Sequence, residues 1–246
     1  MKFQKYIVGI LLLLVFFSGI RAQQTVAEHY HEIDLMPLHF GYTIGLNTMD
    51  FVTYTTQASY NDHQIRAEVR TLQPGFHVGM VSDFRLNRYL SVRCLPGMSF
   101  GSREITFWSD KDSSLNKELV FPYYPLKIPL LIKYKADRIN NYRPYIIGGV
   151  NFHYDFSNSY EGYIKPSGEV YPLIRFKRFD VLYEIGFGID SYFEDFKLST
   201  EIKYCVGIRD VLNHELGKGI VGREEIYTNM FEKVISNQIM LSFHFE

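Results

Sequence analysis

The chain of 246 residues has little cysteine, a single tryptophan, almost no net charge and no long apolar run beyond its N-terminal segment. Its two cysteines, Cys94 and Cys205, allow at most one disulfide. A net charge of −1 gives no field that points to nucleic acid or to anionic lipid. No later apolar run approaches the roughly 18–20 residues that a membrane-spanning helix needs. These absences argue against a nucleic-acid binder and against a helical membrane protein.

The N-terminus has the pattern of a secretory signal peptide over residues 1–22. Lys2 and Lys5 supply positive charge, Tyr6–Phe17 supplies an apolar segment, and Ser18–Ala22 supplies small residues before a cleavage site. The apolar segment is too short to span a bilayer comfortably, so a retained anchor is the weaker interpretation. Residues 23–37 are polar and are predicted to form a periplasmic arm, which leaves residues 38–246 as one folded domain.

Aromatic residues are abundant, at 16%, and many fall on stretches in which apolar and polar side chains alternate. Alternation with a period of two is the signal of a β-strand whose two faces differ. Pro74 and Pro96 make the second and third stretches less regular, because proline cannot donate a ladder hydrogen bond. The stretches are His39–Asn47, Thr71–Asp83, Tyr89–Arg103, Leu126–Lys135, Tyr142–Tyr154, Asp180–Asp190, Phe196–Ile208 and Gln238–Phe245.

The links between these stretches alternate in length. Short turns are predicted at Phe84–Arg88, Ala136–Asn141 and Tyr192–Asp195. Long, polar links are predicted at Thr48–Arg70, Glu104–Phe121, Asp155–Lys177 and Asp210–Lys233. Small outer-membrane barrels have short periplasmic turns and long extracellular loops. The sequence therefore predicts an all-β fold, an eight-stranded antiparallel up-and-down transmembrane β-barrel with four extracellular loops and both termini in the periplasm.

A soluble barrel also alternates, but it places its apolar face inside, so the face that meets lipid needs a separate argument. Here the apolar face carries large Leu, Ile, Phe and Tyr side chains on every strand, which is too much volume for the interior of eight strands. The opposite face carries glycine and ionised residues of both signs. The aromatic final strand, Ile239–Glu246, is also typical of outer-membrane barrels. We therefore predict that the apolar face meets lipid.

Ionised residues on the opposite face are then predicted to point into the lumen. One interpretation is a path for protons or ions, or a ligand site. The other, which we favour, is a set of paired charges that fill an interior only wide enough for side chains. Cys94 is predicted to face outward and Cys205 inward, so both are expected to be free thiols. The lumen residues are Arg93, Lys127, Lys133, Glu184, Asp190, Lys197, Glu201 and Lys203.

Several short patterns resemble catalytic or binding motifs, but none is complete. His214-Glu215 lacks the second histidine of a metalloprotease helix, and Gly217, Gly219 and Gly222 lack the strand–helix context of a nucleotide-binding loop. The pair His29 and His31, beside Glu28 and Glu32, lies in the polar arm. We therefore predict no catalytic, cofactor-binding or metal-binding residues, and no cofactor.

Two alternatives stay open for other polar and aromatic residues. A lipid-modifying enzyme with a serine–histidine pair near the membrane boundary would draw on inward histidines and nearby serines, although no G-x-S-x-G elbow exists. Trp108 and Phe107, in the second long link, would either insert into lipid, bind a partner or pack locally. The candidates for the serine–histidine pair are His77, His153, His244, Ser99 and Ser102.

Three parts of the sequence carry a family resemblance. The first is Pro74–Arg93, continued by Leu95–Arg103, which is similar to the second and third strands of the PorT family. Lys127–Tyr134 with Arg143-Pro144-Tyr145 and Gly148-Gly149 resembles its fourth and fifth strands, and Glu184–Asp190 with Phe196–Lys203 resembles its sixth and seventh. The resemblance implies an integral outer-membrane component of the type IX secretion system, and it offers no catalytic residues.

Taken together, we expect a non-enzymatic outer-membrane barrel that supports the export or maturation of secreted proteins. Its partners are expected to be outer-membrane lipid and other secretion-system proteins, without nucleic acid or a small-molecule substrate. One alternative is a stand-alone structural or adhesive barrel that uses its loops outside the cell. A less favoured alternative is the lipid-modifying enzyme.

Overall fold

The computed structural model describes residues 36–55, 59–60, 63–70, 72–109, 116–157, 160–164, 170–214 and 230–246. These residues form strands, turns and loops without an α-helix. In this part of the chain, no helix has the length and hydrophobicity that crossing a membrane requires. The predicted signal peptide lies outside the described residues, as does the predicted arm except for its last two positions.

The strands occupy most of the described chain. They are β1 (Leu38–Thr48), β2 (Asp50–Thr55), β3 (Ser59–Tyr60), β4 (His63–Val69), β5 (Pro74–Arg85), β6 (Leu90–Cys94), β7 (Gly97–Ser109), β8 (Lys117–Tyr123), β9 (Pro125–Lys135), β10 (Tyr142–Asp155), β11 (Tyr160–Ile164), β12 (Val170–Arg175), β13 (Phe179–Tyr192), β14 (Lys197–Gly207) and β15 (Phe231–Phe245).

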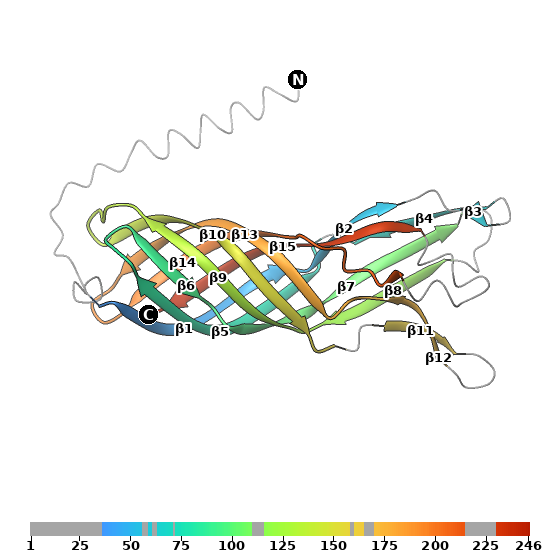
Figure 1. Cartoon of the computed structure of the whole chain (residues 1–246), viewed down its shortest axis with the longest axis horizontal. Coiled ribbons are helices and arrows are strands. Elements are labelled where there is room, and N and C mark those ends of the chain that lie inside the picture. Colours follow the sequence, from blue (N-terminus) through green and yellow to red (C-terminus); the bar gives the residue numbers. More distant parts are fainter. Residues whose placement is uncertain are drawn as a thin grey trace, which may run out of the picture.

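These strands close into an antiparallel ring of eight (Figure 1). Several positions in the ring are filled by two successive strands, because β1 continues into β2, β4 into β5, β6 into β7 and β8 into β9. β1 closes the ring, since it pairs with β15 on one side and with β5 on the other. The predicted eight-stranded antiparallel barrel is therefore confirmed.

The three predicted short turns lie at one end of the barrel, which we call the short-turn end. Each turn is closed by a backbone hydrogen bond: Leu86 N to Leu90 O at 2.9 Å, Ala136 N to Pro144 O at 2.9 Å and Phe193 N to Phe196 O at 2.9 Å. The last residue is held at the same end, because Glu246 N donates to Lys197 O at 2.9 Å.

The predicted long links differ from the structure, because strands occupy parts of all four. The first contains β2, β3 and β4, the second contains the end of β7 and the start of β8, the third contains β11 and β12, and the fourth contains the start of β15. In Figure 1, β2, β4, β7 and β8 continue well past the ends of β10 and β13. We call this part of the wall the extension.

The side-chain pattern reverses between the barrel and its extension. In β1, Phe40 and Leu46 are exposed while Thr43 and Asn47 are buried, as lipid outside and polar groups inside require. From Ile105 to the end of β7, and in β8, the buried side chains are apolar, among them Phe107 and Phe121 in the cluster defined below. The extension thus packs like a soluble β-protein. This reversed pattern places polar residues on the outside, and for that reason the sequence predicts these segments as loops.

Candidate functional site

The interior of the barrel is filled by the predicted lumen charges. Every one of them is buried, so the predicted inward face is confirmed for the whole set. They are Arg93, Lys127, Lys133, Glu184, Asp190, Lys197, Glu201 and Lys203. They come from four strands, β6, β9, β13 and β14, and they share the inner face because every second residue of a strand points inward.

One group of ion pairs lies near the short-turn end. Arg93 Nη2 is 2.8 Å from Asp83 Oδ2 and 2.7 Å from Glu246 Oε1. The other oxygen of Glu246 is 2.8 Å from Lys197 Nζ. Because the guanidinium and both carboxylates are buried, this group is a compact, charge-compensated plug rather than a solvated channel lining.

A second group lies further along the interior. Lys203 Nζ is 3.0 Å from Glu184 Oε2 and 3.3 Å from Glu201 Oε1. Tyr145 donates its hydroxyl to Glu201 at 2.9 Å, and Asn151 donates its amide to Glu184. These bonds agree with the interpretation in which paired charges fill the interior, because each carboxylate has both a cation and a neutral hydrogen-bond donor as partners.

Lys133 and Lys127 differ most in the number of partners that their buried ammonium groups have. Lys133 Nζ donates to both oxygens of Asp190 at 2.8 Å. Its ammonium also lies 3.8 Å from the centre of the Tyr145 ring, within range of a cation–π contact. The ammonium of Lys127 has no hydrogen-bond partner among the described residues.

The histidines of the enzyme alternative are all buried in the interior, and one of them bonds to a serine. His77 Nε2 lies 3.1 Å from Ser242 Oγ, so the serine partner is on β15 rather than Ser99 or Ser102. His153 bonds to the Tyr123 hydroxyl at 3.1 Å. The cavity beside the Ser242–His77 pair has a volume of about 20 Å³. That volume is about enough for one water molecule, so the cavity has no room for a lipid chain.

An apolar cluster closes the interior toward the extension. It is formed by side chains from β2, β7, β8, β12 and β15, from the segments that follow β12 and β14, and from the residue before β15. Its members are Phe51, Ile105, Phe107, Leu119, Phe121, Ile174, Phe176, Val211, Leu212, Met230, Phe231 and Val234. Aromatic rings inside it stack, as Phe51 and Phe176 do with ring centres 4.8 Å apart. We call this group the apolar seal.

Arg103 separates the charged interior from the apolar seal. Its guanidinium lies 3.5 Å from the centre of the Tyr123 ring and 4.3 Å from that of Phe51, and it donates to Ser236 Oγ at 3.2 Å. Stacking on two rings satisfies a buried cation without a direct carboxylate contact. Neither this residue nor the seal was predicted as a feature. The reversed alternation, with Ile105 and Phe107 two residues apart, is the sequence signal that marks them.

Of the candidates that remain, the structure describes His214, Phe107 and Trp108. His214 is exposed, and its Nε2 is 2.6 Å from Asp210 Oδ2. Glu215, the loop glycines and the His29–His31 pair lie outside the described residues. Phe107 is fully buried in the seal while its neighbour Trp108 is 51% exposed, so the two aromatics do not act together and sit on a strand rather than in a loop.

The predicted thiols are confirmed as free: Cys94 is partly exposed on β6 and Cys205 is buried on β14. Within the described ranges, no group of three or more His, Cys, Asp or Glu side chains is arranged to hold a metal ion. The expectation that the protein uses no cofactor stays a prediction.

A closed antiparallel ring with an apolar outside and a charged inside defines a small outer-membrane β-barrel. The family comparison agrees with this class. Residues 22–213 match the family described as outer membrane protein beta-barrel domain, and the chain belongs to that family.

Solved outer-membrane proteins are similar to this chain at low sequence identity. OprG from Pseudomonas aeruginosa is 14% identical, with a TM-score of 0.43, over 83% of this chain and 95% of that chain. Ail, the attachment invasion locus protein of Yersinia pestis, is 14% identical, with a TM-score of 0.37, over 85% and 99% of the two chains. AlkL is 10% identical, with a TM-score of 0.38, over 91% of each chain. No curated protein matches the chain.

Proposed function

We propose that this barrel is a non-enzymatic accessory of the type IX secretion system, which supports the export or maturation of secreted proteins. The observation that carries the proposal is the blocked interior. Ion pairs around Arg93 and Lys203 fill the lumen, and the apolar seal lies across it beyond Arg103. A protein whose lumen is filled does not conduct cargo itself, so its contribution to secretion is made through its outer surfaces. The system is suggested by the resemblance of Pro74–Arg103 to the PorT family.

We further propose that the extension lies outside the cell and that the short-turn end, with both termini of the barrel, lies in the periplasm. Short turns on the periplasmic side are the rule for bacterial barrels. The extension offers a rigid surface for a partner, because its outward side chains rest on the apolar seal. Exposed aromatic and charged groups of that surface include Tyr54, Arg66, Trp108 and Glu118.

Orientation is tested with a membrane-impermeant maleimide on intact cells. Trp108→Cys lies on the extension, and Asp137→Cys lies at the short-turn end, where Asp137 is 61% exposed. In a background with Cys94 and Cys205 replaced by serine and alanine, Trp108→Cys is expected to react in intact cells and Asp137→Cys only after permeabilisation. The reverse pattern would overturn the orientation.

The secretory role is tested by deleting the gene and following a C-terminally tagged cargo. Cargo is expected to accumulate in the periplasm, and normal export in the deletion strain would contradict the proposal. Complementation with Tyr54→Ala/Trp108→Ala is expected to restore the barrel but not export. Ile139→Ala, which removes an exposed apolar side chain at the short-turn end, is the control.

A pull-down from solubilised membranes separates this proposal from a stand-alone barrel. Secretion-system partners are expected with the wild-type chain and are expected to be reduced with Tyr54→Ala/Trp108→Ala. Recovery of an isolated monomer, together with normal export, would favour the structural or adhesive alternative.

A further inference from the structure

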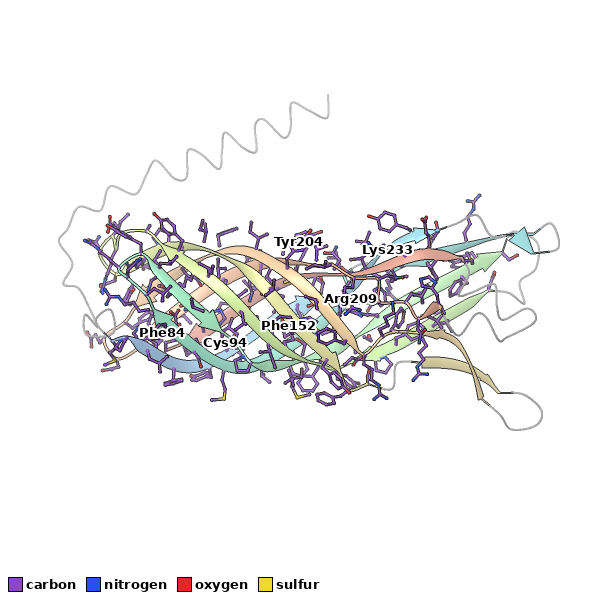
Figure 2. The ribbon with its side chains drawn as sticks, in the orientation of Figure 1. Phe84, Cys94, Phe152, Tyr204, Arg209 and Lys233 are labelled. Carbon is purple, nitrogen blue, oxygen red and sulfur yellow. The ribbon has the colours of Figure 1, made fainter. Side chains whose placement is uncertain are left out.

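Basic side chains gather on the outer wall where the barrel meets its extension. Lys177 and Arg178 immediately precede β13, and Arg209 follows the end of β14. All three side chains are exposed. Figure 2 shows Arg209 near this junction, with Tyr204 of β14 nearer the middle of the barrel. We call Lys177, Arg178 and Arg209 the basic rim.

Backbone contacts hold two members of the basic rim next to each other. Lys177 N donates to Val211 O at 2.7 Å, and Lys177 Nζ donates to Asp210 O at 3.0 Å. The guanidinium of Arg209 lies 5.9 Å from the centre of the Phe179 ring, and Phe179 is itself two residues from Lys177. Arg209 therefore lies beside an exposed aromatic side chain, and Lys177 is bonded to the backbone next to Arg209.

The carboxylate that follows Arg209 in sequence, that of Asp210, is already engaged in hydrogen bonds. Asp210 Oδ1 accepts hydrogen bonds from Leu212 N at 3.1 Å and Val234 N at 2.9 Å, and its Oδ2 is 2.6 Å from His214 Nε2. Neither Lys177 nor Arg209 forms an ion pair with a carboxylate among the described residues. Lys177 and Arg209 thus carry exposed positive charge that an anionic ligand can contact.

The same wall carries an apolar hollow on its lipid-facing side. Its volume is about 760 Å³, and its lining includes Ile132, Ile146, Gly148, Ile185 and Tyr204. Gly148 lies at its floor, because the neighbouring outward positions on β9 and β13 are Ile132 and Ile185. This volume falls within the ~300–1,000 Å³ typical of sites for small ligands.

The spacing between rim and hollow matches one leaflet of a bilayer. From Phe179 to Ile185 the strand runs six residues, or roughly 20 Å at ~3.3 Å per residue. Strands tilted by ~35–45° reduce this to roughly 15 Å along the membrane normal. Half of a hydrocarbon core ~30 Å thick is the same distance. A lipid with its head at the basic rim would therefore place the ends of its acyl chains at the hollow.

We propose that this wall binds a phosphorylated glycolipid of the outer leaflet, of the lipid A type. Lys177 and Arg209 contact its phosphate, and an acyl chain occupies the hollow over Gly148. Arginine and lysine are the usual phosphate ligands in proteins, and arginine adds paired hydrogen bonds. The choice of the outer leaflet rests on the proposed orientation of the extension, but not on the secretory role.

The test is binding of defined lipids to the purified full-length barrel in detergent, measured by native mass spectrometry. The probes are bisphosphorylated lipid A, the same lipid A without phosphates, and phosphatidylglycerol. Lys177→Gln/Arg209→Gln is expected to weaken binding of bisphosphorylated lipid A at least tenfold, to the level of the phosphate-free form. Arg66→Gln, which removes an exposed charge from β4, is the matched control and is expected to leave binding unchanged.

A second variant tests the hollow without altering any charge. A Cβ on Gly148 would meet only Glu184 O, at 3.4 Å, so the strand accepts a side chain there. Gly148→Leu is expected to weaken lipid A binding severalfold, whereas Val78→Leu on the opposite wall is not. The circular dichroism spectrum of each variant verifies that it is folded.

Three results would overturn the proposal: equal binding of phosphate-free lipid A, no effect of Lys177→Gln/Arg209→Gln, or tighter binding of phosphatidylglycerol than of lipid A. If Lys177→Gln/Arg209→Gln does not fold, the proposal is tested by the binding of lipid A to Gly148→Leu and by the binding of phosphate-free lipid A to the wild type. The purified barrel needs no secretion partner in this assay, so the two proposals can fail separately. Normal export in the deletion strain would contradict the secretory role without affecting the lipid site.

Discussion

Glu246, the last residue of the chain, binds Arg93 across the interior of the barrel. The two side chains meet at 2.7 Å although 153 residues separate them in sequence. Because Glu246 also binds Lys197 of β14, one carboxylate connects β6, β14 and the end of β15. The pairing of β15 with β1 closes the ring, so this contact lies beside the seam between the first and last strands.

Replacing Glu246 with Gln is expected to destabilise the barrel. The change leaves Lys197 without its carboxylate and takes one partner from Arg93, which keeps Asp83. Breaking a buried ion pair typically costs ~3–5 kcal/mol, and the remaining Asp83 contact places the expected loss near the lower end. Urea unfolding in detergent micelles at neutral pH measures it. Glu194→Gln, at an exposed turn position, is the control, and equal unfolding midpoints for the two variants would contradict the expectation.

The neighbours Phe107 and Trp108 are expected to differ sharply in their effect on stability. Phe107 is fully buried in the apolar seal, so Phe107→Ala is expected to cost ~3–5 kcal/mol, as for other large-to-small changes in a core. Trp108→Ala is expected to change the free energy of unfolding by less than ~0.5 kcal/mol, because half of its surface is exposed. Chemical denaturation followed by circular dichroism measures both. Similar losses for the two variants would show that the seal is not a packed core.

Two adjacent glycines of β10 are expected to tolerate a methyl group differently. A Cβ on Gly149 would lie 2.2 Å from Leu130 O, a backbone atom of β9, so the strands would have to separate. A Cβ on Gly148 meets nothing closer than 3.4 Å. Gly149→Ala is expected to cost ~1–3 kcal/mol through overpacking, whereas Gly148→Ala is expected to be close to neutral. Refolding yield into lipid vesicles and the urea midpoint report the difference, and the opposite order would show that the β9–β10 spacing is wrong.

The barrel itself was predictable because each strand has one lipid-facing and one inward side. In β14, Lys197, Glu201 and Lys203 alternate with exposed Ile202 and with Tyr204, and the structure buries all three charges. The period of two identifies the strand, and the large apolar side chains on one face, with glycine and charges on the other, identify the side that meets lipid. The prolines were equally informative, since Pro96 separates β6 from β7.

The strands of the extension were not predictable by the same rule, because their outer face is polar, as for a strand in water, whereas the outer face of the barrel is apolar. Leu119 and Phe121 alternate with exposed Glu118 and Val120, which is the pattern of a strand in water. If lipid is assumed outside, such a segment looks like a polar loop with isolated aromatics.

The partners of the interior charges could not be predicted from the sequence either. The alternation places Arg93 and Glu201 inward, but it does not assign Glu246 to the interior. Pairing across the lumen depends on strand tilt and register, which period two does not contain.

Acid is expected to loosen the contact between the end of β14 and the start of β15 through Asp210. Partial burial raises the pKa of the Asp210 carboxyl, but hydrogen bonds from Val234 N and Leu212 N, with the contact to His214, outweigh burial and hold that pKa below its ordinary value. A carboxyl whose pKa is lowered in the folded state contributes stability that is present above the unfolded pKa, near pH 4, and is lost as the pH falls through the folded value.

Asp210→Asn provides the matched comparison, because asparagine keeps the shape and does not titrate. The amide hydrogen of Val234 is expected to exchange more slowly in the wild type than in Asp210→Asn at pH 7, after correction for intrinsic exchange rates. That difference is expected to shrink as the pH is lowered from 5 to 3. A difference in protection that stays constant over this range would show that the Asp210 carboxylate does not hold β15 in place.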